Sequence, residues 1–159
     1  MMMVQKVPLT HKGFQNLQDE LKKLKDERPH IRNALEEARK LGDFSENAEL
    51  DAARDRQGFV EGRIKELEDK IARADVIDIT KMSGTQIRFG ATVTLFDEDS
   101  EDILTYQIVG DEEADIKAGL LSISSPLSRA LIGKNKGESC EIRTPRGQKY
   151  YEIRDVLYA

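Results

Sequence analysis

Apolar residues recur every three or four positions through most of the first 75 residues of the chain. They form two segments, one ending near Ala38 and one starting near Leu50. This heptad spacing is typical of two helices that pack along a narrow apolar seam. Each segment has one polar seam position, Arg28 in the first and Gln57 in the second. The seam positions are Leu17, Leu21, Leu24, Arg28, Ile31, Leu35 and Ala38, then Leu50, Ala53, Gln57, Val60, Ile64, Leu67, Ile71 and Ala74.

The ends of these segments predict how the helices are connected. The break near Gly42 is too short for a parallel pair, so we expect an antiparallel hairpin. Thr10 is expected to cap the first helix, because its hydroxyl can accept a free backbone amide. Pro29 lies inside the first segment, where we expect a kink because proline removes one backbone hydrogen bond.

The pattern changes near residue 76, where β-branched residues and turn residues replace the heptads. Ser125 and Pro126 indicate the cap and first position of a short helix that ends at Gly133. The chain is therefore predicted to be of α+β class, with a helical coiled-coil hairpin at 1–77, a linker at 78–84 and a second domain at 85–159. In the second domain we expect a twisted antiparallel sheet with strands at 87–89, 91–96, 103–109, 120–123, 140–144 and 150–157.

Charge and composition narrow the possible partners. The net charge is −5, and residues 1–77 and 78–159 carry −1 and −4 respectively. Neither part is a basic nucleic-acid-binding module, so we expect no specific binding to free DNA. No apolar run is long enough to span a membrane, and we expect no membrane partner. With Cys140 as the single cysteine, no intrachain disulfide can form, and we expect a cytoplasmic location.

The sequence shows no arrangement of residues that would form a catalytic site on its own. His11 and His30 have no cysteine companions at zinc-binding spacing, and no glycine-rich phosphate loop is present. We expect both histidines on the surface of the first helix. Cys140 falls in a predicted strand without a neighbouring histidine, and we expect it to pack as a small apolar residue.

An acidic stretch at the break between the two helices carries the clearest candidate chemistry. Residues 42–50 read GDFSENAEL and include Asp43, Glu46 and Glu49. One interpretation is a capping box, in which Asp43 accepts amides of the second helix and Glu46 reaches back. The other is a metal site, because Mg²⁺ prefers carboxylate oxygens. Two loop carboxylates cannot hold Mg²⁺ tightly alone, so a partner would have to supply further ligands.

Several long motifs resemble a known family. They are GDFSENAEL, RDRQGFVEGRIKELEDKIARADVID, FGATVTL and TYQIVGDEEADIKAGLLSISSPLSRALIGKNKGE. In this order they resemble the bacterial Gre transcript cleavage factors, a family of transcription elongation factors, and within it the GreA type. The resemblance covers essentially the whole chain. It implies a coiled coil that enters the secondary channel of RNA polymerase and a second domain of FKBP-like fold that docks on the β′ rim.

The resemblance also implies roles for particular residues. Asp43 and Glu46 match the acids that hold a Mg²⁺ ion shared with the polymerase and position a water molecule. The chain would then be no enzyme itself, and would stimulate the polymerase to cleave backtracked RNA. Glu49 could take part or only solvate the second helix, and Leu50 stands where many relatives carry tyrosine. Ser124, Ser125 and Pro126 match a polymerase-docking segment, with helix capping as the alternative role.

Four basic residues flank the acidic stretch. They could hold the 3′ end of the nascent RNA through its phosphates, or form ordinary ion pairs on exposed helix faces. Their mixture with acids favours the GreA type over the more basic GreB type. The four residues are Arg39, Lys40, Arg54 and Arg56.

Functions of three other classes remain open from the sequence. A polymerase inhibitor of the same family would occupy the channel without stimulating cleavage, but such proteins alter the acids that Asp43 and Glu46 match. A prolyl isomerase needs an aromatic-lined pocket, and this chain has no tryptophan and 6% aromatic residues. A coiled-coil scaffold would not need a folded second domain.

Overall fold

The computed structural model describes residues 5–42 and 47–159. The chain divides into two compact units. The hairpin unit contains Phe14–Ala74, and the sheet unit contains Lys6–Gly13 with Asp75–Ala159. Each unit is described by itself below. None of the helices described is both long and apolar enough to cross a membrane.

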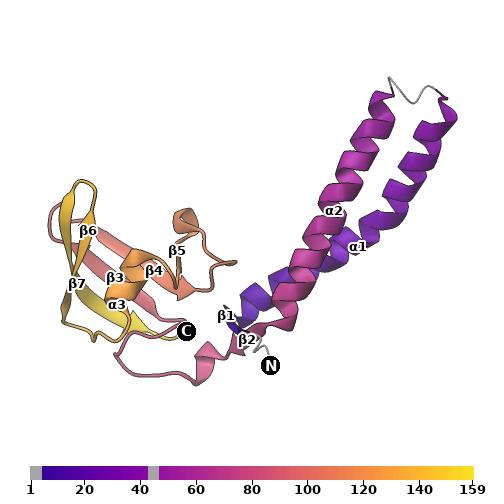
Figure 1. The fold of residues 1–159 in the computed structure, drawn as a ribbon. Helices are drawn as coiled ribbons and strands as arrows, with labels where there is room; N and C mark the ends of the chain where they lie inside the picture. Colours follow the sequence, from indigo (N-terminus) through magenta and orange to yellow (C-terminus); the bar gives the residue numbers. More distant parts are fainter. Residues whose placement is uncertain (1–4, 43–46) are drawn as a thin grey trace. The chain divides into compact units, whose positions relative to one another are not determined.

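Two long helices that run antiparallel, α1 (His11–Lys40) from Phe14 onward and α2 (Ala48–Ala72), make up the hairpin unit (Figure 1). The α+β class and the helical hairpin are therefore confirmed. Helix α1 continues through Pro29. The second helix ends before Ala74, which belongs to β2, so the last predicted seam position was wrong. The buried seam residues are Leu17, Leu24, Ile31, Leu35 and Ala38 of α1 and Leu50, Val60, Ile64 and Leu67 of α2.

The predicted cap of the first helix is confirmed. The amide of Gly13 donates to Thr10 Oγ1 over 3.0 Å, and the hydroxyl of Thr10 donates to the carboxylate of Glu113. The same carboxylate accepts the amides of Thr10 and Gly110, each over 3.0 Å. A Cβ on Gly13 would lie 2.1 Å from Glu113 Cδ, so the glycine is what allows this carboxylate to approach the helix.

The sheet unit contains a five-stranded sheet in the order β5-β4-β3-β7-β6. Neighbouring strands are antiparallel except β4 and β5, which are parallel. The fully antiparallel sheet expected from the sequence therefore has one parallel edge, since the chain between β4 and β5 returns to the level of Gln107 before β5 pairs with the last three residues of β4. The strands are β3 (Thr92–Asp97), β4 (Ile103–Val109), β5 (Leu120–Ser122), β6 (Ser139–Thr144) and β7 (Gly147–Leu157).

One face of this sheet forms the core of the unit. Along β3 half-buried and buried positions alternate, as expected for a strand whose two faces are covered to different extents. Val93 and Leu95 are completely buried, as is Leu131 from the short helix α3 (Pro126–Leu131). Cys140 is also buried in this core, which raises the pKa of its thiol, so the prediction of a packed apolar role is confirmed.

Several local predictions in the second half were wrong. Residues 87–89 form no strand. Ile87 is buried but lies in an irregular segment, and its amide donates to Lys134 O over 2.8 Å. Two short strands were not predicted, β1 (Val7–Thr10) and β2 (Ala74–Ile77), which together form a separate two-stranded sheet.

The predicted linker contains a 3₁₀ turn, Ile79–Lys81. Ile79 packs so closely on Gly90 that a Cβ there would lie 2.7 Å from its side chain.

Candidate functional site at the connected ends of the hairpin

Asn47 joins the connected ends of the two helices through its side chain. Its Oδ1 accepts the amide of Leu50 over 3.0 Å, which caps α2. Its Nδ2 donates to Ala38 O over 2.6 Å, a carbonyl in the last turn of α1. Ala38 O also accepts the amide of Leu41 over 3.2 Å, so Asn47 supplies its second donor. One buried side-chain amide therefore bonds to terminal backbone groups of both helices.

The structure therefore corrects the capping interpretation of the acidic stretch. Helix α2 begins at Ala48 with Asn47 as its cap, too far along the chain for Asp43 to cap it. Sequence reasoning missed Asn47, although an asparagine directly before a periodic segment is a common helix-start signal. Asp43 and Glu46 themselves lie outside the described residues.

The first turn of α2 separates an acidic exposed face from the buried seam. Glu49 and Asp51 are exposed there, where negative charge favours a helix N-terminus. Leu50 is completely buried, so its side chain contributes to packing between the helices. At the end of α1, Gly42 has a φ of 82°, a left-handed conformation that suits glycine at a helix end.

The four basic residues of the candidate RNA site have different surroundings. Arg39 and Arg54 are exposed. Lys40 forms an ion pair with Glu37 over 3.2 Å in which both side chains are largely exposed. Arg56 is engaged across the hairpin, since its Nε and Nη2 donate to the two carboxylate oxygens of Glu27 over 2.5 and 2.6 Å.

Two more bidentate arginine–glutamate pairs connect the helices. Arg28 donates to both oxygens of Glu61 over 2.8 Å each, and Arg63 donates to both oxygens of Glu20 over 2.7 and 3.0 Å. These hydrogen bonds are the main cause that lowers the pKa of Glu61 and of Glu20. The hydrogen bond from Arg56 lowers the pKa of Glu27 in the same way. Bidentate pairs add geometric specificity because both N–H···O contacts must form together.

The predicted docking segment of the sheet unit has a clear structural role. Ser125 Oγ accepts the amide of Ser128 over 3.2 Å and caps α3, and Pro126 occupies its first turn. The hydroxyl of Ser124 donates to Asp111 Oδ1 over 2.7 Å. Hydrogen bonds from the hydroxyls of Ser122 and Ser124 lower the pKa of Asp111. Ser124 and Pro126 are exposed, so capping leaves both side chains accessible.

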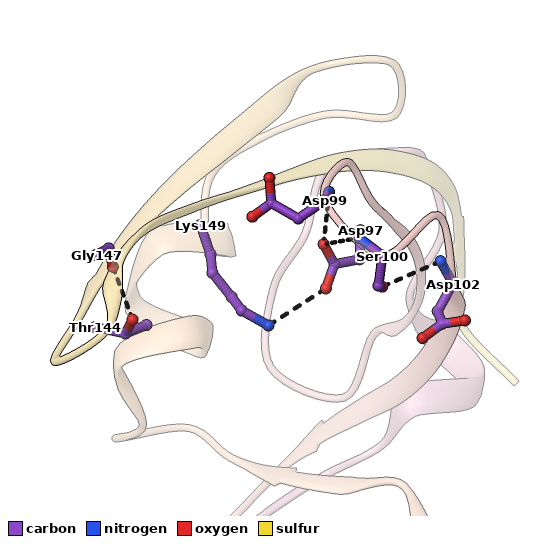
Figure 2. Close-up of polar contacts among 7 residues, drawn as sticks. All are labelled: Asp97, Asp99, Ser100, Asp102, Thr144, Gly147 and Lys149. Carbon is purple, nitrogen blue, oxygen red and sulfur yellow. Dashed lines mark hydrogen bonds and ion pairs between the residues drawn. The ribbon is translucent and has the colours of Figure 1, made fainter.

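A second polar cluster, shown in Figure 2, closes the turn between β3 and β4. Asp97 is 3% exposed, and its Oδ1 accepts the amides of Asp99 and Ser100 over 2.9 and 3.3 Å. Lys149 donates to its other oxygen over 3.4 Å. The pKa of Asp97 lies below its usual value, because these hydrogen bonds and Lys149 outweigh the opposing effect of burial. These contacts explain Asp97 as a structural residue of the turn.

No group of three or more histidine, cysteine, aspartate or glutamate side chains among residues 5–42 and 47–159 is arranged to hold a metal ion. The capping of α2 by Asn47 nevertheless bears on the acidic stretch. The helix takes its cap at the amide of Leu50 from the side chain of Asn47, not from a carboxylate. The residue types at 43 and 46 fit a hard cation such as Mg²⁺, provided that another molecule completes the ligand set.

Comparisons with known proteins cover nearly the whole chain. Residues 7–76 match the family model of the transcription elongation factor N-terminal domain, and residues 82–158 match that of the GreA/GreB C-terminal domain. The chain is 60% identical over 154 residues to transcription elongation factor GreA of Caulobacter vibrioides strain NA1000, covering 96% of this chain and 98% of that protein.

A second relative and one solved structure give similar coverage. Transcription elongation factor GreA of Sinorhizobium medicae is 60% identical over 157 residues, covering 98% of this chain and 99% of that protein. The crystal structure of GreA factor homolog 1 of Thermus thermophilus is 28% identical and covers 96% of this chain and 99% of that chain, with a TM-score of 0.41.

Proposed function

Because the chain belongs to the GreA/GreB family of transcription elongation factors, we propose that it stimulates RNA polymerase to cleave the RNA of backtracked complexes. The observation that carries this proposal is the identity of 60% to GreA over 154 residues, together with two carboxylates in the connection of the hairpin. The chain would act as an elongation factor, and the bond cleavage would take place in the polymerase. Arrested complexes would then resume synthesis from a new RNA 3′ end.

The proposed route for the hairpin is the secondary channel of the polymerase. Two antiparallel helices form a narrow element, and Asn47 forms hydrogen bonds with both of their connected ends. Such an element can carry its terminal loop into a channel too narrow for a globular domain. The sheet unit would dock on the rim of the β′ subunit through the exposed residues Ser124 and Pro126, with Ser125 holding the local helix start.

Asp43 and Glu46 would hold a Mg²⁺ ion together with ligands from the polymerase and the RNA. When bound there, the ion would supply charge stabilisation for the attacking and leaving oxygens of phosphodiester hydrolysis. Carboxylate oxygens not bound to the ion can accept a hydrogen bond from the attacking water and orient it. Arg39, Lys40 and Arg54 lie on the last turn of α1 and the second turn of α2, and would attract the RNA phosphates.

The test compares the two acids with a neighbouring acid of the same charge. Asp43→Asn and Glu46→Gln should each lower the maximal rate of cleavage in a stalled, backtracked complex by about 100-fold. Binding to the polymerase should change little, because the hairpin faces and the sheet unit provide most of the contact area. Asp51→Asn is the matched control, since it removes one exposed carboxylate from the first turn of α2. It should retain cleavage near the wild-type rate.

A second arm locates the chemistry. With a polymerase whose own metal-binding carboxylates have been removed, the wild-type chain should give no shortened RNA. Cleavage in that complex would show that the chain carries a complete nuclease site. Full activity of both acid variants with the intact polymerase would contradict the proposed role of Asp43 and Glu46.

A further inference from the structure

The middle of the hairpin lacks the apolar packing found on either side of it. The seam positions there are Arg28 and Gln57, and neither is buried. A hollow of about 310 Å³ opens beside them, lined by Arg28, Ile31, Arg32, Gln57 and Glu61. Pro29 lies in the same part of α1, where it removes one backbone hydrogen bond. Apolar packing alone therefore specifies the alignment of the two helices poorly at this level.

Two bidentate ion pairs cross the hairpin at this polar level. In one, Arg28 of α1 donates to Glu61 of α2, and in the other Arg56 of α2 donates to Glu27 of α1. Each helix thus supplies one guanidinium and one carboxylate. A slide of one helix along the other by a few ångströms would break the paired N–H···O contacts on both sides.

The guanidinium of Arg56 in α2 donates hydrogen bonds to α1. Two of its nitrogens are bonded to Glu27, whose side chain is only 30% exposed. Its guanidinium also lies 5.1 Å from the ring centre of Phe59, within the range of a cation–π contact. These contacts hold the planar group in one orientation and direct its Nε–H and one Nη2–H at α1.

We propose that Arg56–Glu27 and Arg28–Glu61 are positioning pairs that keep the two helices in register across the polar level. They thereby fix the relative position of Lys40 and Ala48, the helix ends that the connecting loop joins. This assigns Arg56 to the hairpin itself, in place of the RNA contact expected from the sequence. The consequence for cleavage rests on the proposed function, whereas the consequence for register does not.

The cleavage test is a charge exchange between Glu27 and Arg56. Arg56→Glu and Glu27→Arg should each lower the maximal rate of stimulated cleavage about tenfold, because small misplacements of acting groups are costly. The concentration of factor that gives half of the maximal rate should change less than twofold. The double variant Glu27→Arg with Arg56→Glu should restore the rate, since it rebuilds the pair with its ends reversed.

A matched exchange within one helix provides the control. Lys22 and Asp26 form an exposed ion pair within α1 over 3.4 Å. Lys22→Glu with Asp26→Lys exchanges the same kinds of charge without affecting a link between helices, and should leave the rate unchanged. If the double exchange at residues 27 and 56 stays as inactive as Arg56→Glu alone, the proposal is wrong and a direct contact of Arg56 with RNA is indicated. Wild-type rates in both single variants would also overturn it.

Register can be measured without polymerase. Spin labels at Glu36→Cys in α1 and Ala52→Cys in α2, in a Cys140→Ala background, report the distance between exposed positions of the two helices. Arg56→Glu should broaden the distance distribution, and the double exchange should narrow it again. An unchanged distribution in Arg56→Glu would overturn the proposed register role. If the wild-type chain stimulates no cleavage, the proposed function fails, and this measurement still decides the role of the ion pairs.

Discussion

The two units of the chain achieve a defined structure by different means. In the sheet unit, residues from three strands and a helix are completely excluded from solvent, for example Leu95, Ile108, Ile153 and Leu131. In the hairpin unit, the α1 side of the seam remains 6–8% exposed at Leu17, Leu24, Ile31 and Leu35. The middle of that seam is polar. In a pair of helices, each helix can bury only one stripe of side chains against the other. A sheet covered by a helix can surround its core side chains from several directions.

The difference shows what directional polar contacts contribute to the hairpin. Where burial is limited, the alignment of the helices depends on bidentate ion pairs along the seam and on Asn47 at the connected ends. In the sheet unit, buried polar groups such as Asp97 satisfy single turns beside an apolar core. In the hairpin unit, side-chain contacts therefore align the elements, as backbone hydrogen bonds between strands do in the sheet unit.

The largest expected effect compares a core truncation in each unit. Ile153→Ala should destabilise the sheet unit by about 3–5 kcal/mol, because Ile153 is completely buried and the cavity cannot collapse easily. Ile31→Ala should cost the hairpin unit about 2 kcal/mol, since its neighbours can relax toward solvent. Urea unfolding separates the two, because tyrosine fluorescence reports only the sheet unit, which contains all four tyrosines. Far-ultraviolet circular dichroism reports mainly the long helices. Equal costs at the two sites would contradict the contrast between the units.

The next effect concerns Asn47, which joins the helix ends. Asn47→Ala should destabilise the hairpin by about 1–2 kcal/mol, because it removes the cap of α2 and one of the two donors to Ala38 O, the other being the amide of Leu41. Asn47→Asp is the matched control, since a carboxylate can still accept the amide of Leu50 but cannot donate to Ala38 O. Thermal unfolding followed by circular dichroism should place Asn47→Asp between wild type and Asn47→Ala. If aspartate restored full stability, the hydrogen bond to Ala38 O would contribute nothing.

The hairpin was predictable from the sequence because its seam follows a local period, and β3 because its residues alternate. The contacts that refine the candidate site were not, since each depends on partners that a local pattern does not reveal. Glu113 meets Thr10 across 103 positions of the chain. For Arg56 the sequence left an RNA contact and an ion pair as alternatives, because it shows the charge but not the pairing with Glu27 in the opposite helix. Asn47 was overlooked because Asp43 and Glu46 have the spacing of a capping box, a pattern that outweighed the simpler asparagine signal.

A smaller effect concerns the pH dependence of the hairpin unit. The pKa values of Glu20, Glu27 and Glu61 are lowered by their arginine partners in the folded chain. A carboxylate with a lowered pKa stabilises the fold fully above its unfolded pKa, about 4.3 for glutamate, and loses this contribution as the pH falls through the folded value. Hairpin helicity should therefore decrease as the solution is acidified through this range.

The control for this prediction removes the three carboxylates together. In the variant Glu20→Gln, Glu27→Gln and Glu61→Gln, thermal unfolding by circular dichroism should show a lower stability at neutral pH and a weaker dependence on acid. A variant with the pH dependence of the wild type would show that other groups, such as Asp97 or Asp111 of the sheet unit, account for the acid response.

The smallest expected effect is a stabilisation in the sheet unit. Glu101, in the turn between β3 and β4, is the one non-glycine residue with a positive φ, 64°, within the part of the chain that the structure describes. Its amide donates to Asp97 O over 2.8 Å, so the backbone there is held in place. Glu101→Gly relieves the steric cost of the side chain in this conformation, but also gives the unfolded chain more freedom, so the net gain should be about 0.5–1 kcal/mol. Glu101→Gln is the matched control, because it removes the same charge and keeps the Cβ. Urea unfolding followed by tyrosine fluorescence should show the gain for glycine only, and a similar gain for glutamine would attribute it to relief of acidic repulsion in the turn instead.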